Sequence, residues 1–150
     1  MSTDARPHFR ALDESEIWAI LARNHVGRIA YTFHDRVDIV PVHYLYSDGW
    51  IYGRTSPGEK IVTLAHHRWV AFEVDEVEGP YDWRSVIVRG GLYLLLPDDP
   101  HWEHALQLIR RAAPDALTEH DPTPFRTVLF RIAVQESSGR EGISVPRARV

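Results

Sequence analysis

The sequence predicts a mainly β fold, in which about six antiparallel strands are accompanied by short flanking helices. The main observation is that apolar segments rich in β-branched and aromatic residues follow one another through turns, and not through helices. Only three segments show the helical spacing of apolar residues. With 150 residues, 44% of them hydrophobic, the chain is long enough to build one core. These features are typical of an antiparallel sheet or closed barrel with added helices, and they exclude a parallel doubly wound fold.

The first expected element is a short helix that follows a polar lead-in at residues 1–11. Asp13 is the expected N-cap, and Glu16 three residues later completes an arrangement like a capping box. The apolar residues that share one face of this helix are Ile17, Ile20 and Leu21.

Three strands are expected between residues 26 and 53. The segments 26–33 and 37–46 are apolar and rich in β-branched or aromatic residues, with a turn at 34–36 between them. Pro41 interrupts the second strand, and because proline has no N–H it belongs at an edge, at a bulge or where the backbone faces a ligand. The sequence Ser47-Asp48-Gly49 indicates a hairpin that leads into a third, short strand.

A second helix is expected over residues 57–66, with Ser56 as its N-cap and Glu59 completing a capping box. Two strands follow it, at 69–77 and 82–96, and Gly90-Gly91 predicts a bulge or bend in the longer one. The remaining expected elements are a third helix that starts at Pro97 and ends before Pro114, and a last strand at 127–135. We expect one domain over 1–150, with loosely ordered tails at 1–11 and 137–150.

Composition and charge narrow the class of function. The net charge of −4, without a basic tract, argues against binding to nucleic acid. The absence of cysteine removes disulfides, thiol catalysis and thiolate metal sites. Neither a signal peptide nor an apolar run of membrane-spanning length is visible, so we expect a cytoplasmic protein with no membrane contact.

The segment from Arg54 to Lys60 carries the clearest chemical signal. Lys60 is the only lysine among 17 basic residues, so the other 16 are arginines. A strand that delivers Arg54, Thr55 and Ser56 to a helix N-terminus offers the cation, hydroxyl and free N–H groups that a phosphate needs. The competing interpretation is an ordinary capped helix start in an arginine-rich chain.

Residues 26–96 as a whole resemble the flavin-binding split-barrel family of the pyridoxamine 5′-phosphate oxidases, and most of all its short, nitroimidazole-resistance-type branch. The resemblance rests on five segments in the family's order and spacing. They are Gly27-Arg28-Ile29-Ala30, Pro41-Val42-His43-Tyr44, Ile51-Tyr52-Gly53-Arg54-Thr55, Gly58-Glu59-Lys60 and the stretch from Trp83 to Gly90.

This resemblance implies a six-stranded split barrel that holds FMN at a homodimer interface. By position, the phosphate would be held by Gly53, Arg54, Thr55 and Lys60. The strand of Pro41, Val42, His43 and Tyr44 would run along the isoalloxazine ring. Trp83, Arg84 and Ser85 would approach the ring or the ribityl chain from the opposite protomer or the same one.

Departures from the family pattern predict that the chain is not a true pyridoxamine phosphate oxidase. Glu59 precedes Lys60 where the oxidases carry an Arg-Lys pair, Ser85 stands where they carry glutamine, and the tail lacks their tryptophan. The resemblance therefore implies an FMN-dependent oxidoreductase, with reduced nicotinamide as electron donor and an acceptor that the sequence does not identify.

The alternatives are a barrel that binds deazaflavin F420 or haem, and a non-catalytic flavin-binding or interaction module. His43 is the candidate for a catalytic residue or a haem ligand. The competing interpretation is that it is an ordinary strand histidine whose ring is hydrogen-bonded to the backbone. His101 and His104 flank Glu103 at a spacing that suits a metal, but no third ligand is evident, so we expect no metal.

Overall fold

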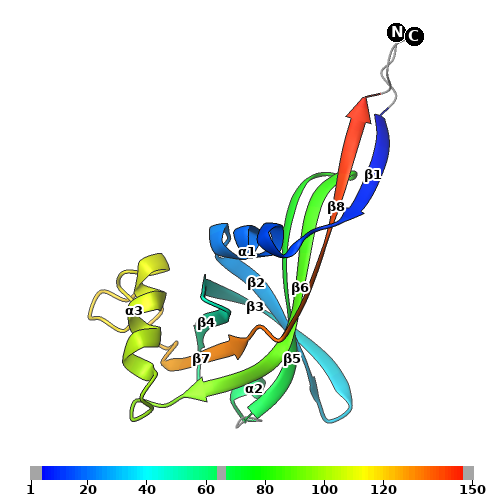
Figure 1. Cartoon of the computed structure of the whole chain (residues 1–150). Helices are drawn as coiled ribbons and strands as arrows, with labels where there is room; N and C mark the ends of the chain where they lie inside the picture. The colour runs from blue at the N-terminus through cyan, green and yellow to red at the C-terminus, as the bar shows by residue number, and fades with distance from the viewer. Residues whose placement is uncertain (1–4, 64–66, 147–150) are drawn as a thin grey trace.

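Six strands form a closed antiparallel barrel, and two further strands extend it as an arm (Figure 1). The computed structural model describes residues 5–63 and 67–146. The elements are β1 (Ala5–Ala11), α1 (Glu14–Arg23), β2 (Val26–Phe33), β3 (Arg36–Ser47), β4 (Trp50–Thr55), α2 (Lys60–Thr63), β5 (His67–Gly79), β6 (Asp82–Leu95), α3 (Trp102–Ala112), β7 (Val128–Ala133) and β8 (Glu136–Pro146). The strand order is β1-β8-β6-β5-β2-β3-β4-β7, and an additional β6–β7 pairing closes the ring. The predicted mainly β, antiparallel split barrel with short helices is confirmed.

Strand β6 belongs to both the barrel and the arm, because its two halves pair with different neighbours along one edge. Its segment 92–95 pairs with β7, whereas 83–89 pairs with β8. At the change of partner, a Cβ on Gly90 would overlap the carbonyl of Ala133, so only glycine allows this close approach. At Gly90-Gly91, where the sequence predicted a bulge or bend, the edge of β6 changes its pairing from β8 to β7. The ladder with β5 runs through it, and that ladder's own register shift lies between Val77 and Gly79.

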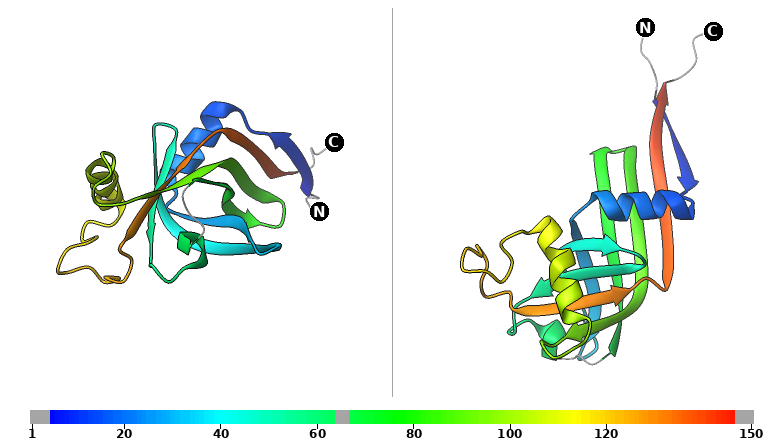
Figure 2. Two further views of the ribbon diagram at one scale, coloured as in Figure 1. Left: turned by 90° about the horizontal axis from the view of Figure 1, so that it is seen from below. Right: turned by 60° about the vertical axis from the view of Figure 1, so that its left-hand side comes forward.

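The arm corrects the prediction of loosely ordered tails. Where little regular structure was expected, β1 and β8 pair in antiparallel register from Ala5–Pro146 to Ala11–Arg140. The Arg10 guanidinium fastens the base of the arm, since it lies 2.8 Å from the buried carboxylate of Glu141 and also pairs with Glu16. Figure 2 shows the two strands projecting side by side from the barrel. The remaining tail residues, 1–4 and 147–150, lie outside the described residues.

Helix α1 forms as the sequence predicts. The Asp13 carboxylate accepts the Glu16 N–H at 2.9 Å, and the Glu16 carboxylate accepts the Asp13 N–H at 3.2 Å, which completes the capping box. The three apolar residues predicted to share a face are all buried: Ile17, Ile20 and Leu21. They pack into the core that fills the barrel.

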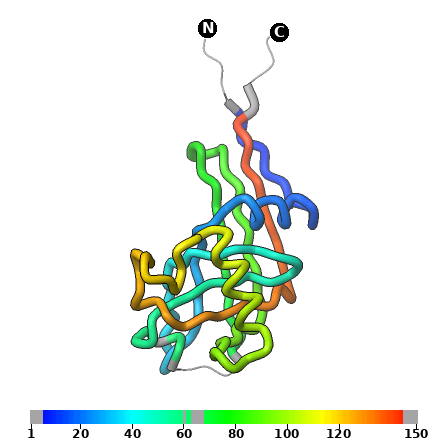
Figure 3. The backbone as a smooth tube through the Cα atoms, turned by 90° about the vertical axis from the view of Figure 1, so that its left-hand side faces the viewer, coloured from blue at the N-terminus to red at the C-terminus, as the bar shows by residue number. Residues whose placement is uncertain are grey.

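Helix α3 closes the other side of the barrel and has a core of its own. It begins at Trp102, later than the expected start at Pro97, and packs against β3, β4 and β7. Its buried residues Leu106, Leu108 and Ile109 meet Tyr52 and Leu129 there. Figure 3 shows α3 and the chain that follows it lying across β4 and β7.

Helix α2 begins later than predicted, and its described part is a single turn. The sequence favoured a helix over 57–66, but only Lys60–Thr63 is helical, and residues 64–66 lie outside the described residues. Ser56 therefore does not cap a helix start. Its carbonyl accepts the Glu59 N–H at 3.2 Å in a turn that precedes α2. One turn of helix has little macrodipole, so the argument for a phosphate at a helix N-terminus is weakened.

Candidate functional site

The candidate site lies where β3 and β4 separate. Strand β3 pairs with β2 along residues 36–43, but with β4 only along 44–47. No described strand pairs with the second edge of β3 at residues 37–43. The Tyr44 N–H donates to the His25 carbonyl at 2.9 Å on the β2 side. Because backbone groups alternate along an antiparallel strand, those of Pro41 and His43 point to the open edge. Pro41 thus lies at a strand edge, one of the positions expected for it.

Two adjoining cavities open at this edge. The first, which we call the β3 groove, has a volume of about 210 Å³. It is lined by Val26, by Val40, Pro41, Val42 and His43 of β3, by Arg54 and Thr55 of β4, and by Ser56, Glu59, Phe125 and Arg126. Exposed strand backbone, two hydroxyls, two arginine side chains and one carboxylate are therefore gathered in one groove.

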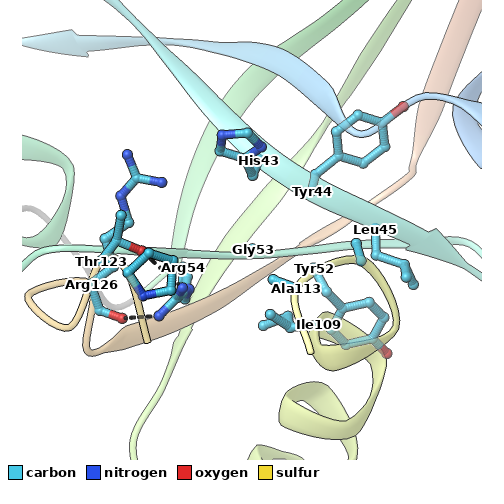
Figure 4. A pocket seen from close by; sticks show the side chains of 12 residues that line it. His43, Tyr44, Leu45, Tyr52, Gly53, Arg54, Ile109, Ala113, Thr123 and Arg126 are labelled. Atoms are coloured by element: carbon cyan, nitrogen blue, oxygen red, sulfur yellow. Dashed lines mark hydrogen bonds between the residues drawn. The ribbon is translucent and has the colours of Figure 1, made fainter. Parts of the chain in front are cut away.

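The second cavity, which we call the α3 cavity, has a volume of about 250 Å³ and lies between the barrel and helix α3 (Figure 4). The barrel contributes His43, Tyr44, Leu45, Tyr52, Gly53 and Arg54. Helix α3 and the segment between α3 and β7 contribute Ile109, Ala112, Ala113, Pro122, Thr123 and Arg126. The two cavities share His43, Arg54 and Arg126.

Most of the residues predicted to bind the cofactor meet around these cavities. They are Pro41, Val42, His43, Tyr44, Gly53, Arg54 and Thr55. His43 is exposed, and Tyr44 is buried with its hydroxyl donating to the Leu21 carbonyl at 2.8 Å. Burial raises the pKa of Tyr44, so its hydroxyl stays protonated.

Two of the predicted residues lie away from both cavities. Trp83 lies at the base of the arm, with its ring 6.1 Å from that of Phe9. Ser85 is also on the arm half of β6, and its hydroxyl is 3.5 Å from the Glu73 carboxylate. The side chain of Lys60 lies outside the described part of the structure.

Arg54 has a partner that the sequence argument missed. Its guanidinium forms a two-pronged ion pair with Asp121, with Nη1–Oδ2 at 2.6 Å and Nη2–Oδ1 at 3.0 Å. It also donates to the Thr123 hydroxyl at 3.0 Å and to the Arg126 carbonyl at 3.3 Å. The hydrogen bond from Arg54, with the backbone N–H groups of Leu117 and Thr123, holds the pKa of Asp121 well below its usual range. Arg54 therefore anchors the segment between α3 and β7, and its charge is largely neutralised.

Arg126 is the second residue that sequence reasoning missed. Its side chain lines both cavities, and within the described residues its guanidinium makes no hydrogen bond or ion pair. Its one described partner is the Phe125 ring, 5.8 Å from the guanidinium carbon. The only sequence signal was an arginine just before a strand, among prolines and threonines, and that pattern is too common to indicate a site.

The described residues hold no group of three or more His, Cys, Asp or Glu side chains that could bind a metal. His104 instead lies edge-on to the Tyr52 ring, with ring centroids 6.2 Å apart. Among the described helices, none has the length and apolar character needed to cross a bilayer.

Comparison with known proteins places these features in context. The family model described as pyridoxamine 5′-phosphate oxidase matches residues 13–141. A crystal structure of a FAD-binding protein from Mesorhizobium loti is 28% identical and superposes with a TM-score of 0.74, covering 92% of this chain and 99% of that one. A FAD-binding protein from Mycobacterium smegmatis is 26% identical, with a TM-score of 0.66 and coverage of 88% and 99%.

A curated relative, an uncharacterized protein of Rhizobium meliloti, is 28% identical over 81 residues. The match spans 54% of this chain and 54% of that relative, so it covers about half of each protein.

Proposed function

The chain belongs to the pyridoxamine 5′-phosphate oxidase family, and on this premise we propose that it binds a flavin in the β3 groove and acts as a flavin-dependent oxidoreductase. The observation that carries the proposal is the family match over 13–141, joined to the likeness in sequence and fold to two FAD-binding proteins. We propose that the bound group is the flavin mononucleotide portion, which FMN and FAD have in common.

The residues of the β3 groove fit such a ligand. The open edge of β3 offers the His43 N–H and the Pro41 carbonyl, which suit the alternating donors and acceptors on the pyrimidine edge of a flavin. Thr55 and Ser56 supply hydroxyl donors for a phosphate, and the exposed side chains of Val26 and Phe125 offer apolar contact with a planar ring. A bound flavin supplies the hydride or electron-transfer chemistry, while the protein holds it and keeps water away.

The residues that would bind phosphate differ from the first expectation. Arg54 has its guanidinium engaged by Asp121, so we propose that Thr55, Ser56 and Lys60 contribute more to phosphate binding than Arg54 does. Glu59 in the same groove opposes a phosphate, and a cation at Lys60 would offset that repulsion.

We further propose that the protein works as a homodimer. Trp83 and Ser85 do not line the cavities of their own chain, so they would reach a flavin only across a subunit interface. The outer face of β2, β3 and β5 exposes several large apolar side chains, which suits such an interface: Val26, Val37, Ile39 and Trp69.

The first test is titration of the colourless protein with FMN, FAD, F420 and haem, followed by the visible spectrum and by flavin fluorescence. We expect FMN or FAD to bind with a Kd in the micromolar range or below, and Lys60→Ala and Thr55→Val each to raise that Kd about tenfold, the effect of losing roughly one good polar contact. Arg111→Ala, at an exposed position of α3 outside both cavities, is the matched control.

Two outcomes would overturn parts of this proposal. Binding of F420 or haem, without binding of FMN or FAD, would reject the proposal that the cofactor is a flavin. If haem binds, loss of that binding in His43→Ala would identify His43 as the axial ligand. Flavin binding without turnover of reduced nicotinamide, in the presence of quinone or nitroaromatic acceptors, would leave a flavin-binding module and reject the oxidoreductase.

A further inference from the structure

We propose that the α3 cavity is a separate ligand site, which takes a small planar apolar molecule with one anionic group, and that Arg126 binds that group. The identity of this ligand as a substrate or electron acceptor rests on the proposed function, because it requires a flavin in the adjoining β3 groove. The site itself is argued from the residues of the cavity.

The walls of the α3 cavity are mainly apolar. Leu45, Tyr52 and Ile109 are buried side chains of β3, β4 and α3, and Ala112 and Ala113 add short side chains on the helix. A cavity of about 150 Å³ lined by apolar residues is known to take benzene, so about 250 Å³ accommodates one substituted ring. Size and lining therefore favour a one-ring aromatic compound over a sugar or a peptide.

The charge balance inside the cavity favours an anion. No carboxylate is among the described residues that line it. Arg54 reaches it, but this guanidinium is held by Asp121, Thr123 and the Arg126 carbonyl. Arg126 is left as the one lining cation without a described ion pair or hydrogen bond. A guanidinium beside apolar walls attracts a carboxylate more strongly than it would in open water, because the local dielectric is low.

Arg126 lies between the β3 groove and the α3 cavity, so its position bears on which of the two proposed ligands it binds. It lies on the wall that both cavities share, together with His43 and Arg54 (Figure 4). The groove has its own hydroxyls, Thr55 and Ser56. The hydroxyls among the described residues of the α3 cavity belong to Thr123, which accepts from Arg54, to Tyr44, which donates to the Leu21 carbonyl, and to the buried Tyr52. An anionic group in the α3 cavity thus has Arg126 as its principal partner, and it lies next to the proposed flavin.

The test uses benzoate and its neutral counterpart benzamide as probes. Calorimetric titration of the flavin-loaded and the colourless protein should give a Kd for benzoate of about 1 mM or lower, at least tenfold below that for benzamide. Arg126→Gln should abolish this preference for benzoate in the flavin-loaded and the colourless protein alike. Arg111→Gln, on an exposed arginine of α3 outside both cavities, should leave the preference intact.

A second variant tests the cavity without touching the arginine. Ala112 is exposed and lines the cavity, so Ala112→Phe can fill the space with little risk to folding, and it should weaken benzoate and benzamide alike. The proposal is overturned if benzoate does not bind, if Arg126→Gln weakens flavin and not benzoate, or if FAD but not FMN displaces benzoate. In the last case the cavity holds the adenosine part of the cofactor. A protein that binds no flavin but keeps the benzoate preference would reject the proposed function and support the anion site.

Discussion

Gly53 lies at the candidate site in a position where there is no room for a side chain. It lies on β4 opposite Tyr44, where β3 and β4 begin to separate. A Cβ at this position would lie 2.5 Å from the Phe130 ring and 3.0 Å from the His43 carbonyl. Phe130 is fully buried, so its ring has little room to move. Glycine here allows the core aromatic to pack against the strand that lines both cavities.

We therefore predict that Gly53→Ala destabilises the protein by about 1–3 kcal/mol, the usual cost of overpacking a tight core. Urea denaturation followed by tryptophan fluorescence would measure the change. Gly58→Ala is the matched control, because no atom lies within 4 Å of a Cβ built at that position. Its stability should change by less than about 1 kcal/mol. Equal midpoints for the parent and Gly53→Ala would contradict the packing argument.

At the scale of secondary-structure elements, an ionic cluster joins the end of α1 to β5 and β6. The Glu76 carboxylate on β5 accepts from Arg23 at 2.6 and 2.7 Å and from the Asn24 amide at 2.7 Å. Arg84 on β6 also lies 3.3 Å from it. These donors, with the Arg23 hydrogen bond first, lower the pKa of Glu76 from 4.5 to about 2.

This cluster predicts a specific loss of stability in acid. Because the folded-state pKa is depressed, the contribution of Glu76 is complete above about pH 4.5 and is lost as the pH falls towards 2. Glu76→Gln should therefore cost about 1 kcal/mol at pH 6, and the difference from the parent should shrink by pH 3. Urea denaturation at both pH values would show it. Glu78→Gln is the control, since that side chain is 75% exposed and 3.9 Å from Arg84. A cost that does not change with pH would exclude the ionic mechanism.

Elements with local signals were predictable, and those held by distant partners were not. The capping box of Asp13 and Glu16 lies within four residues, and the structure forms it as expected. Strands β1 and β8 pair across almost the whole chain, and β1 has mostly exposed residues with no apolar alternation to reveal it. No local pattern could therefore have separated this arm from a disordered tail.

The residues of the candidate site likewise fall into two groups, those that local motifs predicted and those that distant contacts bring to the site. The strand residues from Pro41 to Tyr44 and from Gly53 to Thr55 were found through motif spacing, and they do surround the two cavities. Arg54 pairs with Asp121, which is 67 positions away in the sequence. Because the sequence does not reveal this distant partner, it predicted that Arg54 is free to bind a phosphate, whereas in the structure its guanidinium is held by Asp121. The same distant contact brings Arg126 to the site, which explains why it was overlooked.

At the scale of the whole molecule, the distribution of exposed apolar residues supports the proposed homodimer. On the outer face of β3, Val37 is 79% and Ile39 64% exposed, and Trp69 on β5 is 50% exposed. A shallow hollow across the same strands is lined by Ala30, Val37, Trp69 and Ala71, together with Tyr31, Thr32, Val70 and Arg89. A group of large exposed apolar side chains on one face is typical of an interface. The proposed homodimer would cover this face.

The decisive variant for this proposal is Ile39→Glu, which places a charge in the middle of that face. Burying an unpaired carboxylate is costly, so we expect the dimer Kd to rise at least about 100-fold, as for other central interface positions. Sedimentation equilibrium over micromolar concentrations would measure it, with circular dichroism to show that the barrel is intact. Leu96→Glu is the matched control, because Leu96 is 59% exposed but lies beyond the end of β6 and does not line the hollow. If Trp83 and Ser85 of the partner subunit complete the flavin site, Ile39→Glu should also weaken flavin binding over the concentration range in which the dimer dissociates. A parent protein that is monomeric at these concentrations and binds flavin fully would show instead that one chain forms the whole site.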